Sequence, residues 1–111
     1  MKPAKYGNRK TVVDGITFDS AKEAKRWGEL CLLQKAGVIA GLDRQYRYPL
    51  HGQDAPILTQ TGRQAYYVAD FVYEDIEAKA VVIEDAKGFR TPEYKLKHAI
   101  LAAMGLTIRE V

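Results

Sequence analysis

The sequence is poor in the residues that build disulfides and structural metal sites. Among its 111 residues there is one cysteine, Cys31, and there are two histidines, His51 and His98. A single cysteine excludes a disulfide within the chain, and this ligand set is too small for a structural zinc site. We therefore expect neither a disulfide-stabilised secreted domain nor a zinc finger.

Long apolar runs are also missing. No stretch approaches the roughly 20 consecutive apolar residues of a membrane-spanning helix, and no apolar signal-peptide segment follows the start. The composition, 47% hydrophobic and 28% charged, is that of an ordinary folded protein. We expect a single domain in the cytoplasm, with no membrane partner.

Charge is distributed unevenly around a net charge of +3. Residues 1–10 contain no acid, and we interpret them as a basic N-terminal arm. Residues 70–86 hold six acids and one lysine, and residues 87–99 are basic again. An acidic centre between basic flanks suits a protein that holds a cation in a cleft and a polyanion around it, although a mixed-charge surface can give the same counts.

Local patterns predict a hairpin, two helices and four further strands. Asp14-Gly15 lies between two short β-branched runs and is a signal for a type I′ turn. Ser20 is a helix N-cap, Glu23 completes the capping box, and Gly37 ends that helix. The other elements are strands over 42–50, 64–73, 81–87 and 106–111, and a second helix from Thr91-Pro92 to Gly105. After the hairpin, the order α-β-β-β-α-β predicts an α/β fold of the α+β kind, a mixed sheet flanked by two helices, with residues 11–111 as one domain.

Two acids are expected to meet across adjacent strands. Because side chains alternate between the faces of a strand, Asp85 and Lys87 share one face with Ile83, and Glu84 lies on the other. Asp70 is a lone acid in an apolar row of the preceding strand, and a hairpin can bring it close to Asp85. Facing carboxylates repel unless a cation or proton lies between them, and Mg²⁺ is the obvious cation. Taken singly, a rim acid or a surface Asp–Lys pair needs no such function.

Glu23 is a third acid, for which two roles stay open. As the third residue of a capping box it needs no other explanation. Yet helical spacing puts it in line with Trp27, Leu30 and Cys31, the stripe that should face the sheet. The capping role and an active-site role are compatible.

This arrangement resembles the PD-(D/E)XK nuclease superfamily. The chain has Asp70, fourteen intervening residues and then Asp85-Ala86-Lys87, with an acid on a preceding helix. It is similar to a family of small, mostly uncharacterised phage and prophage proteins assigned to that superfamily. The similar blocks are NRKTVVDGITFDSAKEAKRW, YVADFVY, EDAKGF and YKLK. Ala69 stands where the superfamily name has proline, and Glu84 beside Asp85 leaves two candidates for the motif acid, of which Asp85 shares a face with Lys87.

The resemblance implies a restriction-endonuclease-like core and a phosphodiesterase. Asp70, Asp85 and the Ala86 carbonyl would hold Mg²⁺ or Mn²⁺, and Glu23 would complete the metal site directly or through water. Lys87 would orient or deprotonate the attacking water, or stabilise charge on the phosphorane. We therefore expect a divalent-metal-dependent DNA endonuclease of phage origin. It would be selective for branched DNA such as a Holliday junction, and active as a homodimer.

Residues outside the motif fit a DNA-binding surface less specifically. Lys95 and His98 lie three apart on the second helix, opposite a predicted apolar stripe of Leu96, Ile100 and Ala103, where a solvated helix face is the simpler explanation. The tyrosines of the strands are more typical of packing than of base stacking. The expected DNA contacts are Lys5, Arg9, Lys10, Gln45, Arg90, Lys95 and His98.

The alternative hypothesis is a non-catalytic DNA-binding or structural phage protein that keeps the nuclease fold. Asp70, Asp85 and Lys87 are all present, which argues against it because a decayed site usually loses one of them. A third hypothesis, an unrelated α/β interaction module, needs the ordered blocks to be coincidental.

Overall fold

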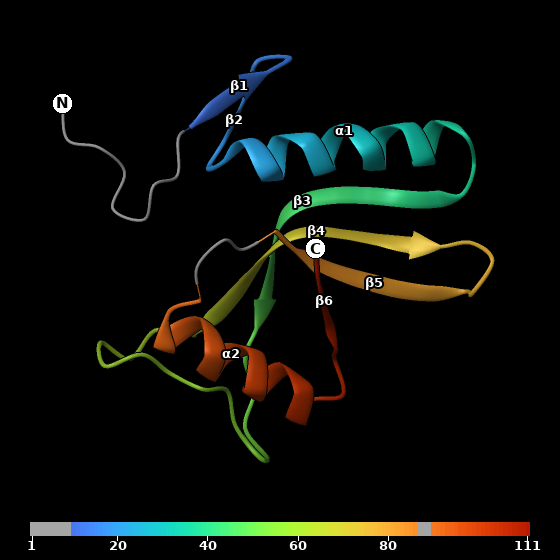
Figure 1. Ribbon diagram of the computed structural model, residues 1–111. Coiled ribbons are helices and arrows are strands. Elements are labelled where there is room, and N and C mark those ends of the chain that lie inside the picture. The colour runs from blue at the N-terminus through green and yellow to red at the C-terminus, as the bar shows by residue number, and fades with distance from the viewer. Residues whose placement is uncertain (1–9, 87–89) are drawn as a thin grey trace, which may run out of the picture.

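A four-stranded mixed sheet, two helices and a hairpin form the fold in a computed structural model that describes residues 10–86 and 90–111 (Figure 1). In chain order the elements are β1 (Thr11–Val13), β2 (Ile16–Phe18), α1 (Ala21–Lys35), β3 (Ile39–Pro49), β4 (Tyr66–Asp75), β5 (Ala80–Asp85), α2 (Pro92–Ala103) and β6 (Ile108–Glu110). The sheet order is β3-β4-β5-β6, with only β5 and β6 parallel among these strands, and β1 pairs with β2 separately. The predicted mixed α+β fold with its N-terminal hairpin is confirmed.

Local chemistry explains where these elements begin and end. Asp14 and Gly15 have φ values of 52° and 78°, the left-handed pair that a type I′ turn requires. The hydroxyls of Ser20 and Thr91 each accept the backbone N–H three residues on, at 3.1 and 3.0 Å, and so begin α1 and α2. Gly37, with φ 81°, follows the end of α1. The predicted turn and helix caps are therefore confirmed.

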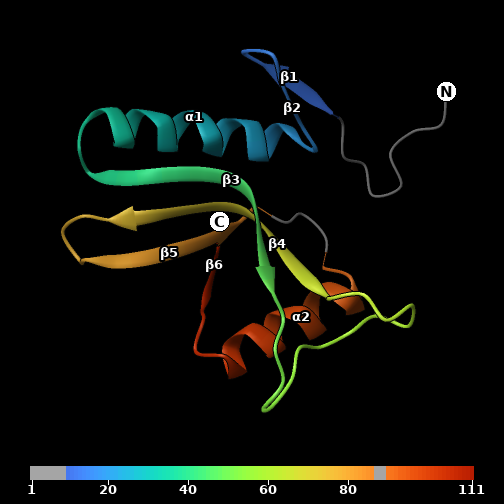
Figure 2. The same cartoon turned by 180° about the vertical axis from the view of Figure 1, so that it is seen from behind.

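Each helix packs against its own apolar cluster on the sheet. Figures 1 and 2 show α1 running along the first half of β3, whereas α2 lies against the other end of the sheet. The buried residues of the α1 cluster are Leu30, Ile39, Phe71 and Tyr73. Those of the α2 cluster are Leu50, Tyr67, Ala69, Ile83, Leu101 and Ile108. Neither helix of the described ranges has the length and apolarity to span a bilayer.

The two longest strands bend where their buried face changes (Figures 1 and 2). In the middle of β3, Gln45 has φ 54°, a left-handed conformation that few residues other than glycine adopt. On β4, Ala69, Asp70 and Phe71 are buried in succession, where a regular strand would alternate. Ala69 belongs to the α2 cluster and Phe71 to the α1 cluster, so one bent strand contributes to both.

The predicted apolar stripe of the second helix is wrong. Leu96 is 63% exposed, and Ala103 is exposed as well. Tyr94, Leu101 and Met104 face the α2 cluster instead, together with Ile100. Tyr94 and Leu101 are seven residues apart, two helical turns, so the aromatic ring and the leucine share a face and Leu96 is turned outward.

Candidate functional site

Asp70 on β4 and Asp85 at the end of β5 lie side by side. The β4–β5 register, continued one step past Phe71 and Glu84, sets the two acids opposite each other. Asp85 Oδ1 accepts the Asp70 N–H at 3.0 Å, and Asp70 Oδ2 accepts the Ala86 N–H at 2.8 Å. Asp70 is 3% exposed and Asp85 0%. The juxtaposition predicted from strand periodicity is therefore present, and we call these two residues the acid pair.

The acid pair is part of a polar row that crosses the sheet. On β3, Arg44 pairs with Phe71 and Tyr46 pairs with Ala69 of β4. Gln45, between them, therefore lies opposite Asp70. On the other side, Asp85 pairs with Glu110 of β6, and the Asp85 carbonyl accepts the Val111 N–H at 2.9 Å. The row therefore takes one residue from each strand of the sheet, at the level of the bend.

Glu23 extends this row toward α1. It lies in the first turn of the helix, is 3% exposed, and its Oε1 accepts a hydrogen bond from Gln45 Nε2 at 3.1 Å. The strained backbone of Gln45 thus coincides with a side chain that contacts a buried acid, and such strain tends to be kept at functional sites. Within residues 10–86 and 90–111, no group of three or more His, Cys, Asp or Glu side chains is arranged as a metal-ligand set. Glu23 therefore forms no three-acid set with the acid pair.

Two of the predicted basic residues converge on Glu110. Arg90 forms an ion pair with one oxygen of the Glu110 carboxylate, and His98 Nε2 lies 3.8 Å from the other. The His98 ring also packs edge-on against Tyr94, with 6.0 Å between ring centroids. His98 therefore lies at the β6 side of the row rather than on a fully solvated helix face. Of the other predicted residues, Lys10 and Lys95 are exposed. Lys5, Arg9 and Lys87 lie outside the described residues.

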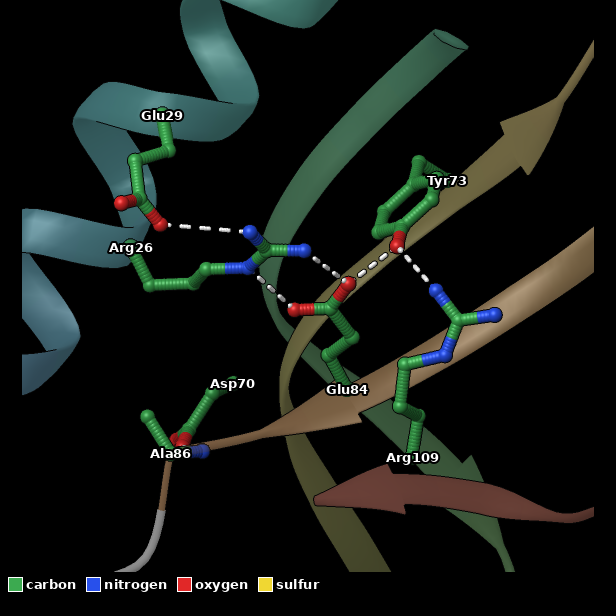
Figure 3. Close-up of polar contacts among 7 residues, drawn as sticks. All are labelled: Arg26, Glu29, Asp70, Tyr73, Glu84, Ala86 and Arg109. Carbon is green, nitrogen blue, oxygen red and sulfur yellow. Dashed lines mark hydrogen bonds and ion pairs between the residues drawn. The ribbon is translucent and has the colours of Figure 1, made fainter. Parts of the chain in front are cut away.

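Glu84 leaves β5 on the face opposite Asp85 and is fully buried. It accepts two hydrogen bonds from Arg26 of α1, Nε to Oε1 at 2.7 Å and Nη2 to Oε2 at 2.8 Å, and a third from the Tyr73 hydroxyl. Arg109 of β6 donates to the Tyr73 hydroxyl oxygen at 3.4 Å. Figure 3 shows these contacts on the α1 side of β5 and the contact between the Asp70 carboxylate and Ala86 at the strand end. This Glu84 network ties α1 to the strand that ends in Asp85.

Sequence reasoning missed Arg26 and the partners of Glu84. Strand alternation correctly turns Glu84 away from Asp85, and a buried carboxylate needs a cation or hydrogen-bond donors. This requirement for a cation is the signal that could have pointed to Arg26. Arg26 lies one turn after Glu23, on the side of α1 that faces the sheet. No spacing rule connects two residues 58 positions apart, so the pairing itself had no local signature.

The Glu84 network predicts a loss of stability at alkaline pH. Burial, with the hydrogen bond to Glu84 and its charge, raises the pKa of Tyr73 to about 12. An unfolded tyrosine has a pKa of about 10, so the stabilisation is complete below pH 10 and is lost as the pH rises to about 12. Over that window we expect Tyr73→Phe to lose about 2–3 kcal/mol less free energy of unfolding than the wild type. Urea denaturation across the range measures this difference. Tyr46→Phe, at an exposed tyrosine, should follow the wild type, and equal slopes for all three proteins would contradict the prediction.

Comparison with known families places the chain in one of them. Residues 3–109 match the model of a family described as "Protein of unknown function (DUF1064)". No curated protein and no solved structure matches the chain. The matched span contains the acid pair, Glu23 and the whole Glu84 network. The chain therefore belongs to the DUF1064 family.

Proposed function

We propose that the protein is a divalent-metal-dependent DNA endonuclease of the PD-(D/E)XK superfamily that acts on branched DNA. The observation that carries the proposal is the acid pair, two buried carboxylates on neighbouring strands, each hydrogen-bonded to the backbone of the other strand. Lys87 follows two residues after Asp85 in the sequence, which completes the superfamily's pattern. An enzyme of this size that cuts both strands of a junction needs two sites, so the active form would be a homodimer.

The acid pair is suited to a hard divalent cation. Two carboxylates buried together repel unless a cation or proton offsets their charge. Mg²⁺ is commonly held by one or two carboxylates, with water and phosphate as its other ligands, so a third acid is not required. Asp70, Asp85 and the Ala86 carbonyl would hold the ion, with Glu23 acting through water. When bound, Mg²⁺ or Mn²⁺ polarises a phosphate oxygen and acidifies the attacking water.

The chain's own groups would orient the reaction. Backbone N–H groups fix one oxygen of each acid, so the sheet itself holds the pair in position. Lys87 would orient or deprotonate the attacking water. Arg90, at the Glu110 end of the row, would offer positive charge to the DNA backbone and make binding dependent on salt concentration, and His98 beside it would offer a hydrogen-bonding ring nitrogen.

The proposal is tested with purified protein and three DNA substrates. Linear, nicked and four-way junction DNA are incubated with Mg²⁺, Mn²⁺ or EDTA. We expect either ion to support cleavage of the junction, EDTA to abolish it, and linear duplex to be cut much more slowly. Tight binding without cleavage of any substrate would favour the second candidate, a non-catalytic DNA-binding protein with the same fold.

Cation binding at the acid pair should increase the stability of the folded protein. A ligand at 100 times its Kd stabilises the folded state by about 2.7 kcal/mol, so Mg²⁺ should raise the thermal unfolding midpoint of the wild type. Asp85→Asn should show no such rise, since its amide oxygen can still accept the Asp70 N–H but the charge is gone. Calorimetry with Mg²⁺ and with EDTA measures both midpoints. The control is Asp75→Asn at the far end of β4, where Asp75 accepts the Ala78 N–H at 3.0 Å. A response shared by all three proteins would place the cation elsewhere.

A further inference from the structure

Two tyrosine hydroxyls are buried on the α2 side of the sheet without a hydrogen-bond partner among the described residues. They belong to Tyr67 and Tyr94. Both rings pack in the α2 cluster, with 6.1 Å between their centroids. A buried hydroxyl without a partner destabilises a protein, and phenylalanine would fill the same space without that penalty. Packing alone therefore does not account for the oxygen atoms of these side chains.

Tyr94 differs from Tyr67 in its relation to the acid pair. It lies in the first turn of α2, where its backbone N–H donates to the Thr91 hydroxyl at 3.0 Å. Burial raises the pKa of the Tyr94 phenol, and the negative charges of Asp85 and Glu110 raise it further, whereas Arg90 lowers it and Asp70 has the smallest effect of these groups. The Tyr94 ring packs edge-on against His98, whose Nε2 lies 3.8 Å from Glu110, the residue that pairs with Asp85 in the polar row. A neutral hydrogen-bond donor is therefore available at the β6 side of the row, where the carboxylates can only accept.

Tyr67, by contrast, lies away from the row. It pairs with Tyr48 on the part of β3 beyond the bend, three residues before Asp70 on β4. Its hydroxyl provides a matched reference, because it is also buried and also without a partner in the described chain. A functional role for Tyr94 should therefore appear as a difference between the two tyrosines.

We propose that the Tyr94 hydroxyl donates a hydrogen bond to a non-bridging oxygen of the DNA phosphodiester bound at the acid pair, and so is a catalytic residue. This inference rests on the proposed function. Attack on a phosphodiester places more negative charge on its non-bridging oxygens, and a fixed donor aimed at those oxygens stabilises that charge without having to reorganise. The phenol ring is held in place by its contacts with Tyr67 and His98, so the donor would be pre-organised.

Tyr94→Phe and Tyr67→Phe test the proposal as a matched pair, since each removes one buried hydroxyl and keeps the ring. With Mg²⁺, Tyr94→Phe should cleave four-way junction DNA about 10²-fold more slowly than the wild type. With Ca²⁺ in place of Mg²⁺, its affinity for the same junction should fall about tenfold. Its thermal unfolding midpoint should be unchanged or higher, because the unpaired hydroxyl is gone. Tyr67→Phe should also have an unchanged or higher thermal unfolding midpoint. Its cleavage rate and its affinity for the junction should equal those of the wild type.

The outcomes separate this inference from the proposed function. If Tyr94→Phe cleaves and binds like the wild type, the inference is overturned and the nuclease proposal stands. If its midpoint falls together with its activity, the hydroxyl has an internal partner such as a bridging water, and the inference is again overturned. If the wild type cleaves no DNA, the proposed function fails. The affinity of Tyr94→Phe for the junction in Ca²⁺ then decides alone whether Tyr94 contacts a DNA phosphate. A tenfold weaker affinity would then support the phosphate donor, and an equal affinity would overturn it.

Discussion

Lys87→Met should lower the rate of DNA cleavage by about 10²–10⁴-fold while the protein stays folded, as for a positioned proton-transfer group. The methionine keeps most of the aliphatic stem and removes the ammonium group that would act on the attacking water. Because the ammonium group would act on the attacking water, the loss should be in the chemical step and not in DNA affinity. Single-turnover cleavage of a four-way junction with Mg²⁺ measures the rate, and the thermal midpoint reports folding.

Lys35→Met is the matched control for this prediction. Lys35 is an exposed residue in the last turn of α1, at the opposite end of the helix from Glu23. The chemical change is identical, so a general effect of lost positive charge would appear in both variants. We expect Lys35→Met to cleave at the wild-type rate. A Lys87→Met protein that unfolds would reveal a structural lysine, and one that cleaves normally would remove Lys87 from the mechanism.

Arg26→Met should destabilise the protein by about 3–5 kcal/mol, the second large effect that we expect. The substitution leaves the carboxylate of Glu84 fully buried and without the two guanidinium hydrogen bonds that offset its desolvation. Small domains have a total stability of about 5–15 kcal/mol, so this single change would remove a large share of it. The free energy of unfolding from urea denaturation at neutral pH measures the loss.

Two further variants show whether the buried charge is the cause. Glu29→Ala removes the other ion-pair partner of Arg26, which is 3.2 Å from the guanidinium and half-exposed, and should cost at most about 1 kcal/mol. The double variant Arg26→Met/Glu84→Leu removes both charges, so it should recover much of the stability that Arg26→Met loses. A small effect of Arg26→Met alone would mean that Tyr73 and Arg109 suffice to hold Glu84.

The parts of the fold that local chemistry determines could be predicted from the sequence. Asp14-Gly15 gives the hairpin because few other pairs adopt two left-handed residues in succession. Ser20 and Thr91 fix the helix starts through their own hydroxyls. The meeting of Asp70 with Asp85 could also be predicted, since it needs only a period of two and a hairpin between adjacent strands.

The parts that depend on packing between distant segments could not be predicted. The conformation of Gln45 and the change of buried face on β4 arise because one sheet packs against two helices at different places, which no single strand encodes. Helical spacing predicts a core position for Leu96, which is exposed, because spacing alone does not say which of two apolar faces meets the sheet. Arg26 and Glu84 meet only in the folded chain, across 58 positions.

The exchange of hydrogen bonds between β4 and β5 has a practical consequence for observing the acid pair. The amide protons of Asp70 and Ala86 are bonded to the two carboxylates themselves, where backbone carbonyls would accept them in a regular ladder. Amide chemical shifts are sensitive to the charge on the acceptor. Two cross-peaks in a nitrogen–proton NMR spectrum should therefore move whenever the pair takes on a cation or a proton. The occupancy of the site can then be followed in solution independently of any cleavage assay.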